Sequence, residues 1–147
     1  MLAPDHILSR LTAAAAADRS PHRTRTIALG SGAASALSGW LRDERPGVID
    51  IVIGDAYTWD VAGQQIFDTL SAEGRSPRRL ILEPHGDDDH LVCEDGAIAA
   101  LETFLKTSER LNPIAVGSGT VNDIVKSASF AVVTALAARC FASLARR

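Results

Sequence analysis

Two short stretches of the chain share a Gly-Ser-Gly core that is suited to holding phosphate groups. "LGSGAAS" spans residues 29–35 and "VGSGTVND" spans residues 116–123. In each, an apolar run precedes the glycines and a helical pattern follows them. Glycine lacks a Cβ, so a diphosphate can approach the backbone amides, and the unpaired N–H groups at a helix start attract an anion. The residue types therefore predict a diphosphate site at one of the two loops.

The later loop is the first candidate. Three charge-assisted hydrogen bonds of about 1.5–3 kcal/mol each would supply much of a micromolar binding energy. The competing interpretation is a tight strand-to-helix turn in which Thr120 and Asp123 form a capping box. Lys126 suits an ordinary ion pair with Asp123 on the helix surface, and the stretch lacks the contiguous Gly-Lys-Ser/Thr of a Walker motif. On the residues alone, both interpretations stay open.

The earlier loop competes as the first turn of an ordinary dinucleotide fold. Asp55 ends the next apolar run 25 residues after Gly30, where a ribose-binding acid is expected, but Ser35 replaces the third glycine. A carboxylate at this place can accept both ribose hydroxyls, with Tyr57 and Thr58 beside it. The alternative is that Asp55 is a solvated turn acid or a helix cap.

An acidic loop, "PHGDDDH", invites a metal interpretation. It gathers His85, His90 and three aspartates at residues 87–89. Contiguous carboxylates in such a loop usually remain solvated, so no metal site is assigned there.

The elements that position these loops alternate between strand and helix. Apolar runs predict strands at residues 26–30, 48–55, 78–84 and 113–117. Helical spacing predicts helices at residues 5–18, 33–43, 59–74 and 94–110, and one long helix from about Thr120 to the end. This order predicts an α/β fold, a Rossmann-like three-layer domain with a mostly parallel sheet. Ligands of such sheets bind beyond the carboxyl ends of the strands, where the candidate loops lie.

Finer features of two helices follow from the same spacing. In the helix over residues 59–74, the side chains expected to point inward are Val61, Ile66, Phe67 and Leu70, and Gly74 suits the C-terminal cap. In the last helix, the apolar stripe begins at Ile124, Val125 and Ala128 and continues through Val132, Val133, Leu136, Cys140, Phe141 and Leu144. We expect this helix to expose an apolar face.

The composition limits the classes of protein to which the chain can belong. The 147 residues suit one domain spanning residues 1–147. Fifteen Lys and Arg against eighteen Asp and Glu give a net charge of −3 without a basic stripe, which argues against a nucleic-acid partner. Cys93 and Cys140 form no disulfide framework and are expected to be buried thiols. No signal peptide or membrane span is indicated, so a cytoplasmic location is expected.

Taken together, these motifs resemble a known family. "PIAVGSGTVNDIVKSAS", residues 113–129, is similar to the signature helix of the sn-glycerol-1-phosphate dehydrogenases. They belong to the group of iron-containing alcohol dehydrogenases, glycerol dehydrogenase and 3-dehydroquinate synthase. "TIALGSGAASAL" resembles the opening strand and helix of that family, and "VIDIVIGDAYTWDVAGQQIFDTL" its second strand and following helix. The resemblance covers about residues 24–129.

The resemblance implies a role for each loop. It places the diphosphate of NAD or NADP on the later glycine loop and makes the earlier loop mainly a turn. The implied cofactor-binding residues are Asp55 and Thr58 on the adenosine side and Gly117, Ser118, Gly119 and Thr120 at the diphosphate. Asp123 is implied as a catalytic and substrate-binding acid near the nicotinamide, and Lys126 lies near the phosphate of a polyol phosphate. The carboxylate of Asp55 would repel a 2′-phosphate, which slightly favours NAD.

The chain also departs from the family, whose members continue into a helical domain carrying an Asp and two His that bind Zn²⁺ or a similar ion. No such ligand set is found here. We therefore expect the NAD(P)-binding domain of a glycerol-1-phosphate dehydrogenase-like oxidoreductase, catalytically silent alone. The full family reaction reversibly reduces dihydroxyacetone phosphate to sn-glycerol 1-phosphate. The alternatives are a non-catalytic nucleotide-binding or regulatory module, which dimerises or binds a partner chain through the last helix, and a 3-dehydroquinate synthase-like lyase fragment.

Overall fold

The structure, a computed structural model, describes residues 9–10, 12–14, 33–84, 90–108, 110–117 and 119–144, with side chains for all of these except residues 34 and 134–144. The chain divides into two compact units, Met1–Glu44 and Arg45–Arg147. In the first unit the described parts are helical, at residues 9–10, 12–14 and in helix α2, Ala33–Glu44. The strand predicted at residues 26–30 and the glycines of the earlier loop lie outside the described residues.

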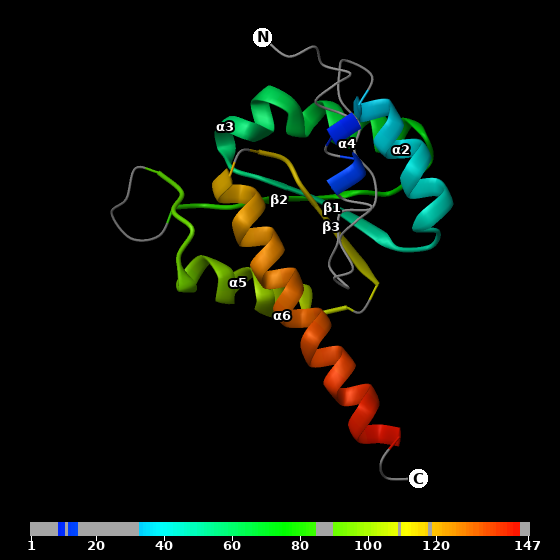
Figure 1. Ribbon diagram of the computed structural model, residues 1–147. Coiled ribbons are helices and arrows are strands. Elements are labelled where there is room, and N and C mark those ends of the chain that lie inside the picture. Colours follow the sequence, from blue (N-terminus) through cyan, green and yellow to red (C-terminus); the bar gives the residue numbers. More distant parts are fainter. Residues whose placement is uncertain are drawn as a thin grey trace. The chain divides into compact units, whose positions relative to one another are not determined.

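The second unit alternates between strand and helix (Figure 1). Its strands are β1 (Ile49–Gly54), β2 (Arg78–Ile81) and β3 (Leu111–Ala115). Its helical segments are α3 (Ala56–Thr58), η1 (Trp59–Gly63), α4 (Gln64–Ala72), α5 (Asp95–Leu105) and α6 (Gly119–Leu144). The strands form a parallel sheet in the order β2-β1-β3. The predicted α/β class, three of the four predicted strands and the long last helix are confirmed.

Helices cover both faces of this sheet (Figure 1). Because side chains alternate along a strand, Ile51 and Ile53 share one face, where they pack with α5 and α6 in the core. Val52 points to the opposite face, in register with Arg79 of β2, whose guanidinium lies 4.5 Å from the centre of the Trp59 ring on η1. The predicted three-layer arrangement is therefore confirmed for this unit.

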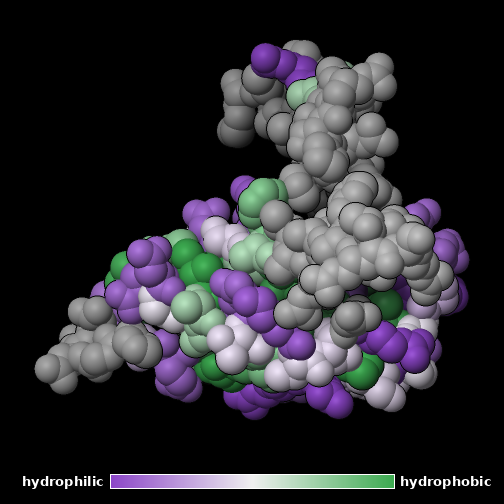
Figure 2. Space-filling view, turned by 90° about the horizontal axis from the view of Figure 1, so that it is seen from below, coloured by the Kyte–Doolittle hydropathy of each residue, from purple (hydrophilic) through white to green (hydrophobic). Residues whose placement is uncertain are grey.

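The last helix contributes a stripe of buried residues to the core. Val121, Ile124, Val125 and Ala128 of α6 are buried, and Val132 packs against them. Val133, which we expected on the same stripe, is 54% exposed because it lies one residue beyond the buried face. Phe130 is 51% exposed, and Figure 2 shows apolar residues exposed among hydrophilic ones on the surface seen from below. The helix thus exposes apolar side chains, and whether a partner covers them stays a prediction.

The helix that follows β1 contains a π-helical turn, η1, between α3 and α4. Trp59 is buried and donates from Nε1 to Oε1 of Gln64 at 3.1 Å. A Cβ at Gly63 would lie 2.8 Å from the Trp59 ring, so only glycine fits there. The expectation that Val61 points inward is wrong, since it is 65% exposed. The wider π turn places Trp59 and Gly63 inward instead.

The predicted C-terminal cap at Gly74 is confirmed. Gly74 has a φ of 79°, its N–H donates to the Ser71 carbonyl at 3.0 Å, and the Arg75 N–H donates to the Leu70 carbonyl at 3.1 Å. This pair of hydrogen bonds is a Schellman motif, which requires a left-handed residue at this place.

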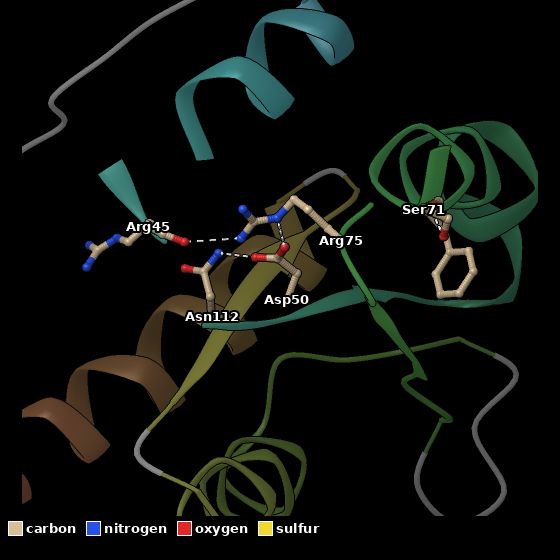
Figure 3. A network of polar contacts seen from close by, with 6 residues as sticks. Arg45, Asp50, Ser71, Arg75 and Asn112 are labelled. Atoms are coloured by element: carbon tan, nitrogen blue, oxygen red, sulfur yellow. Dashed lines mark hydrogen bonds and ion pairs between the residues drawn. The ribbon is translucent and has the colours of Figure 1, made fainter. Parts of the chain in front are cut away.

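A buried polar cluster lies at the amino end of β1 (Figure 3). The Asp50 side chain is 1% exposed, and its Oδ2 pairs with Nε of Arg75 while its Oδ1 accepts from Nδ2 of Asn112 at 2.8 Å. The hydrogen bond to Asp50 is the main cause that raises the pKa of Arg75 above its ordinary value. Arg75 also donates from Nη2 to the Arg45 carbonyl at 3.2 Å. The cluster therefore ties the ends of α4, β1 and β3 together.

Two further predictions concern the cysteines and a membrane span. Cys93 is exposed, so the prediction of a buried thiol is wrong there, because Cys93 lies in the segment between β2 and α5 rather than in the core. The Cys140 side chain lies outside the described part. Among the helices described, none has the length and apolar character needed to cross a membrane.

Candidate functional site

The candidate site lies where β1 and β3 end side by side. These adjacent strands are parallel, with Ile53 opposite Ala115, and the Val116 N–H donates to the Ile53 carbonyl at 2.7 Å. The loops that follow, from Gly54 and from Val116, therefore leave the same edge of the sheet. In open α/β sheets this edge is where ligands bind.

The loop after β1 is organised around Asp55. Its Oδ1 accepts from the Thr58 N–H at 2.7 Å, and its own N–H donates to Oγ1 of Thr58 at 3.0 Å. This reciprocal pair is a capping box at the start of α3. The helix-cap interpretation of Asp55 is confirmed. Within the described part of the chain no hydrogen bond reaches the second carboxylate oxygen, Oδ2, so the same side chain can cap the helix and accept hydroxyls from a ligand.

The loop after β3 contains two glycines with different surroundings. A Cβ at Gly117 would lie 3.0 Å from Cβ of Val121 and 3.2 Å from Cγ2 of Thr58, so tight packing within the chain itself accounts for glycine there. A Cβ at Gly119, the first residue of α6, would meet no heavy atom within 4 Å. Ser118, predicted to bind the diphosphate with them, lies outside the described residues.

Thr120 stands inside the first turn of α6. The helix begins at Gly119, so Thr120 is not at the capping position that the alternative interpretation gave it. Its side chain is half-buried. The N–H groups of residues 119–121 belong to the first turn, where no carbonyl of the helix can pair with them.

Asp123 and Lys126 lie further along α6, and both are exposed. Asp123 lies four residues after Gly119 and Lys126 three residues after Asp123, which places both on the same side of the helix as Gly119, away from the buried Ile124 and Ala128. The surface ion pair between Asp123 and Lys126 is not formed, since the ion pairs recorded among the described residues do not include it. Both charges therefore face solvent beyond the glycine loop.

A metal centre is not supported by the described side chains. Among residues 9–10, 12–14, 33–84, 90–108, 110–117 and 119–144, no three His, Cys, Asp or Glu side chains gather closely enough to hold an ion. Residues 85–89 of the acidic loop lie outside these ranges. The described residues thus contain no three-ligand set for the divalent ion that the family resemblance implies.

The structure brings Asp55, Thr58 and Gly117 together, as expected from the carboxyl ends of neighbouring strands. Gly54 was expected among the residues at this end of the sheet, but its packing role was not predicted. A Cβ there would lie 2.8 Å from Oγ1 of Thr58 and 3.2 Å from the Val116 carbonyl oxygen, so it too must be glycine. The signal was available in the sequence, since a glycine ending a strand marks a close backbone approach.

Part of the chain is similar to a known dehydrogenase. The chain is 31% identical over 110 residues to glycerol-1-phosphate dehydrogenase [NAD(P)+] of Bacillus subtilis (strain 168). The aligned region is 75% of this chain and 27% of the relative, so the chain spans about a quarter of the relative's length. No family model matches the chain. The similarity supports an oxidoreductase-like origin.

Proposed function

We propose that the second unit binds a nicotinamide dinucleotide between the loops that follow β1 and β3. The diphosphate lies against Gly117 and Gly119, with Ser118 and Thr120 beside it. The adenosine ribose lies at Asp55. The proposal is supported by the adjacency of the two loops and by the similarity to a dehydrogenase that uses NAD(P)+.

The single observation that carries the proposal is the open space at Gly119 in the first turn of α6, directly after the carboxyl end of β3. At Gly117 close packing explains the residue, but at Gly119 no described atom would touch an added methyl group. Close approach of a ligand to the backbone is a physical reason for glycine at such a position.

Asp55 favours NAD over NADP. One carboxylate oxygen holds the Thr58 amide, which fixes the direction of the side chain. The other oxygen remains to accept ribose hydroxyls. A 2′-phosphate at the same place would be repelled by the carboxylate, because two negative charges would then share one site.

The family resemblance extends the proposal to a reaction, the reversible reduction of dihydroxyacetone phosphate to sn-glycerol 1-phosphate. The cofactor supplies the hydride. Asp123 lies beside the reacting carbonyl, and Lys126 offers a positive charge to the substrate phosphate. The described residues do not supply three metal ligands, so no metal-assisted step is assigned to this chain.

Calorimetric titration with NADH tests the binding site. We expect the wild type to bind and Gly119→Ala to bind at least about tenfold more weakly, a loss of about 1.4 kcal/mol. The matched control is Gly39→Ala on α2, where an added methyl group also meets no heavy atom within 4 Å. The control should bind like the wild type. Equal binding by wild type and Gly119→Ala would exclude this loop as the diphosphate site.

A further inference from the structure

Thr58 lies in the loop after β1 and close to Gly117 in the loop after β3. Its hydroxyl oxygen accepts from the Asp55 N–H at 3.0 Å and lies 3.4 Å from the Asp55 carbonyl oxygen, to which it donates. Its methyl carbon would lie 3.2 Å from a Cβ at Gly117. One side chain thus bonds to the residue after β1 through its hydroxyl, and its methyl group occupies the space that a side chain at Gly117, after β3, would need.

The backbone of two glycines lies close to the Thr58 side chain. Gly54 and Gly117 approach it, one toward its hydroxyl and the other toward its methyl group, and a Cβ on Gly54 would lie 2.8 Å from Oγ1. The same Cβ would lie 3.2 Å from the Val116 carbonyl oxygen, so the two loops are close to each other as well as to Thr58. Among the side chains, threonine alone carries a hydroxyl and a methyl group on one Cβ.

We infer that Thr58 is a positioning residue, which sets the separation between the carboxylate of Asp55 and the glycine loop. This inference rests on the proposed function. A dinucleotide bridges the two loops, with its ribose on one and its diphosphate on the other, so its affinity depends on their spacing. A ligand that touches one loop alone does not sense that spacing. The hydroxyl of Thr58 is already engaged with Asp55, which leaves the ribose to the carboxylate.

The inference predicts a pattern of ligand affinities that differs from the pattern expected if Thr58 contacted adenosine directly. Thr58→Ser keeps the hydroxyl and its hydrogen bonds and removes the methyl group next to Gly117. We expect this variant to bind NADH about fivefold more weakly, since small misplacements of bound groups are costly. Its affinities for adenosine alone and for pyrophosphate alone should stay within about twofold of the wild type.

The complementary variant is Thr58→Val, which keeps the methyl group and loses the hydroxyl. The Asp55 N–H then lacks its acceptor, while the Thr58 N–H can still donate to the carboxylate, so one of the two hydrogen bonds that hold the turn at Asp55 is lost. We expect weaker binding of adenosine and unchanged binding of pyrophosphate. The matched control is Thr69→Val on α4, where the lost hydroxyl donates only to the Gln65 carbonyl, at 2.8 Å. This control should bind all three ligands like the wild type.

The experiment is a ligand-observed NMR titration of the wild type and the three variants with NADH, adenosine and pyrophosphate, with the melting temperature of each protein measured alongside. A loss of affinity for NADH alone in Thr58→Ser supports the inference. Unchanged NADH affinity in that variant overturns it and leaves the proposed function standing. An equal loss for all three ligands in Thr58→Ser marks a general structural effect and also overturns it. A wild type that binds no NADH overturns the inference and the proposed function together.

Discussion

The two ends of β1 carry an aspartate each, and the two side chains are used differently. Asp50, near the amino end, is 1% exposed at its side chain and gives both carboxylate oxygens to partners of this chain. Asp55, just beyond the carboxyl end, gives one oxygen to the Thr58 amide. Asp50 thus belongs to a polar cluster that occupies both of its carboxylate oxygens. Asp55 keeps one carboxylate oxygen that can accept hydrogen bonds from a ligand. The comparison separates a carboxylate that holds the fold from one that is available to a ligand.

The same contrast holds for the glycines at the carboxyl end. Tight packing within the chain accounts for Gly54 and Gly117, whereas it does not account for Gly119. Polar and glycine residues that internal packing explains carry no information about a ligand. Asp55 Oδ2 and Gly119 are the features of this edge that the described contacts leave unexplained.

The largest effect is expected from substitution of Asp50, near the amino end of β1. Asp50→Ala should lower the free energy of unfolding by about 3 kcal/mol, because it leaves the guanidinium of Arg75 and the amide of Asn112 without their buried acceptor. Urea denaturation measures this change. Asp50→Asn, which keeps an acceptor oxygen, should cost less. A loss below about 0.5 kcal/mol in the alanine variant would show that the cluster does not hold this end of the sheet.

The second prediction contrasts two alanine substitutions in one loop. Gly117→Ala should lower the free energy of unfolding by about 1–3 kcal/mol, because its methyl group would press on Val121 and Thr58. Gly119→Ala should leave that free energy within about 0.5 kcal/mol of the wild type. Thermal and urea unfolding of both variants measure the difference. Equal destabilisation would contradict the distinction drawn between these glycines.

The third prediction separates the two uses of Asp55. Asparagine is also a good N-cap, so Asp55→Asn should retain stability within about 0.5 kcal/mol. Its neutral amide makes weaker hydrogen bonds to ribose hydroxyls, so NADH should bind about tenfold more weakly. Asp55→Ala should lose about 1 kcal/mol of stability in addition. Calorimetry measures the NADH affinity and urea unfolding measures the stability of the same samples. Unchanged NADH affinity in Asp55→Asn would remove Asp55 from the site.

The smallest effect is expected at Tyr57, which is 77% exposed beside Asp55. Tyr57→Ala removes an aromatic surface that flanks the adenosine side of the proposed site. We expect NADH to bind about two- to threefold more weakly, with stability unchanged within about 0.5 kcal/mol. Fluorescence titration with NADH measures the change. A larger effect than that of Asp55→Asn would reverse the order of importance proposed for these residues.

Much of the fold could be predicted from the sequence because its signals are local. The apolar runs of β1 and β3 and the glycine at the end of α4 each specify a structure within a few residues. Val61 was placed wrongly because a π turn shifts the helical period, and its cause, the Trp59 ring lying against Gly63, is a packing contact. A regular 3.6-residue spacing cannot show such a shift.

The site could be predicted only in outline. Asp55 and the glycine loop follow adjacent strand ends, which the alternating pattern implies. The contact of Thr58 with Gly117 depends on strand register and on one rotamer, so no local pattern reveals it. The Asp50 cluster joins residues 25 and 62 positions apart, and a lone acid within an apolar strand gives no hint of its partners.

The most direct test of the central claim is a map of the backbone amide resonances of the chain during titration with NADH. The account predicts shifts at residues 54–58 and 117–123, at the carboxyl ends of β1 and β3, and unchanged resonances at Asp50, Arg75 and Asn112. Shifts confined to the Asp50 end, or none at either end, would contradict it.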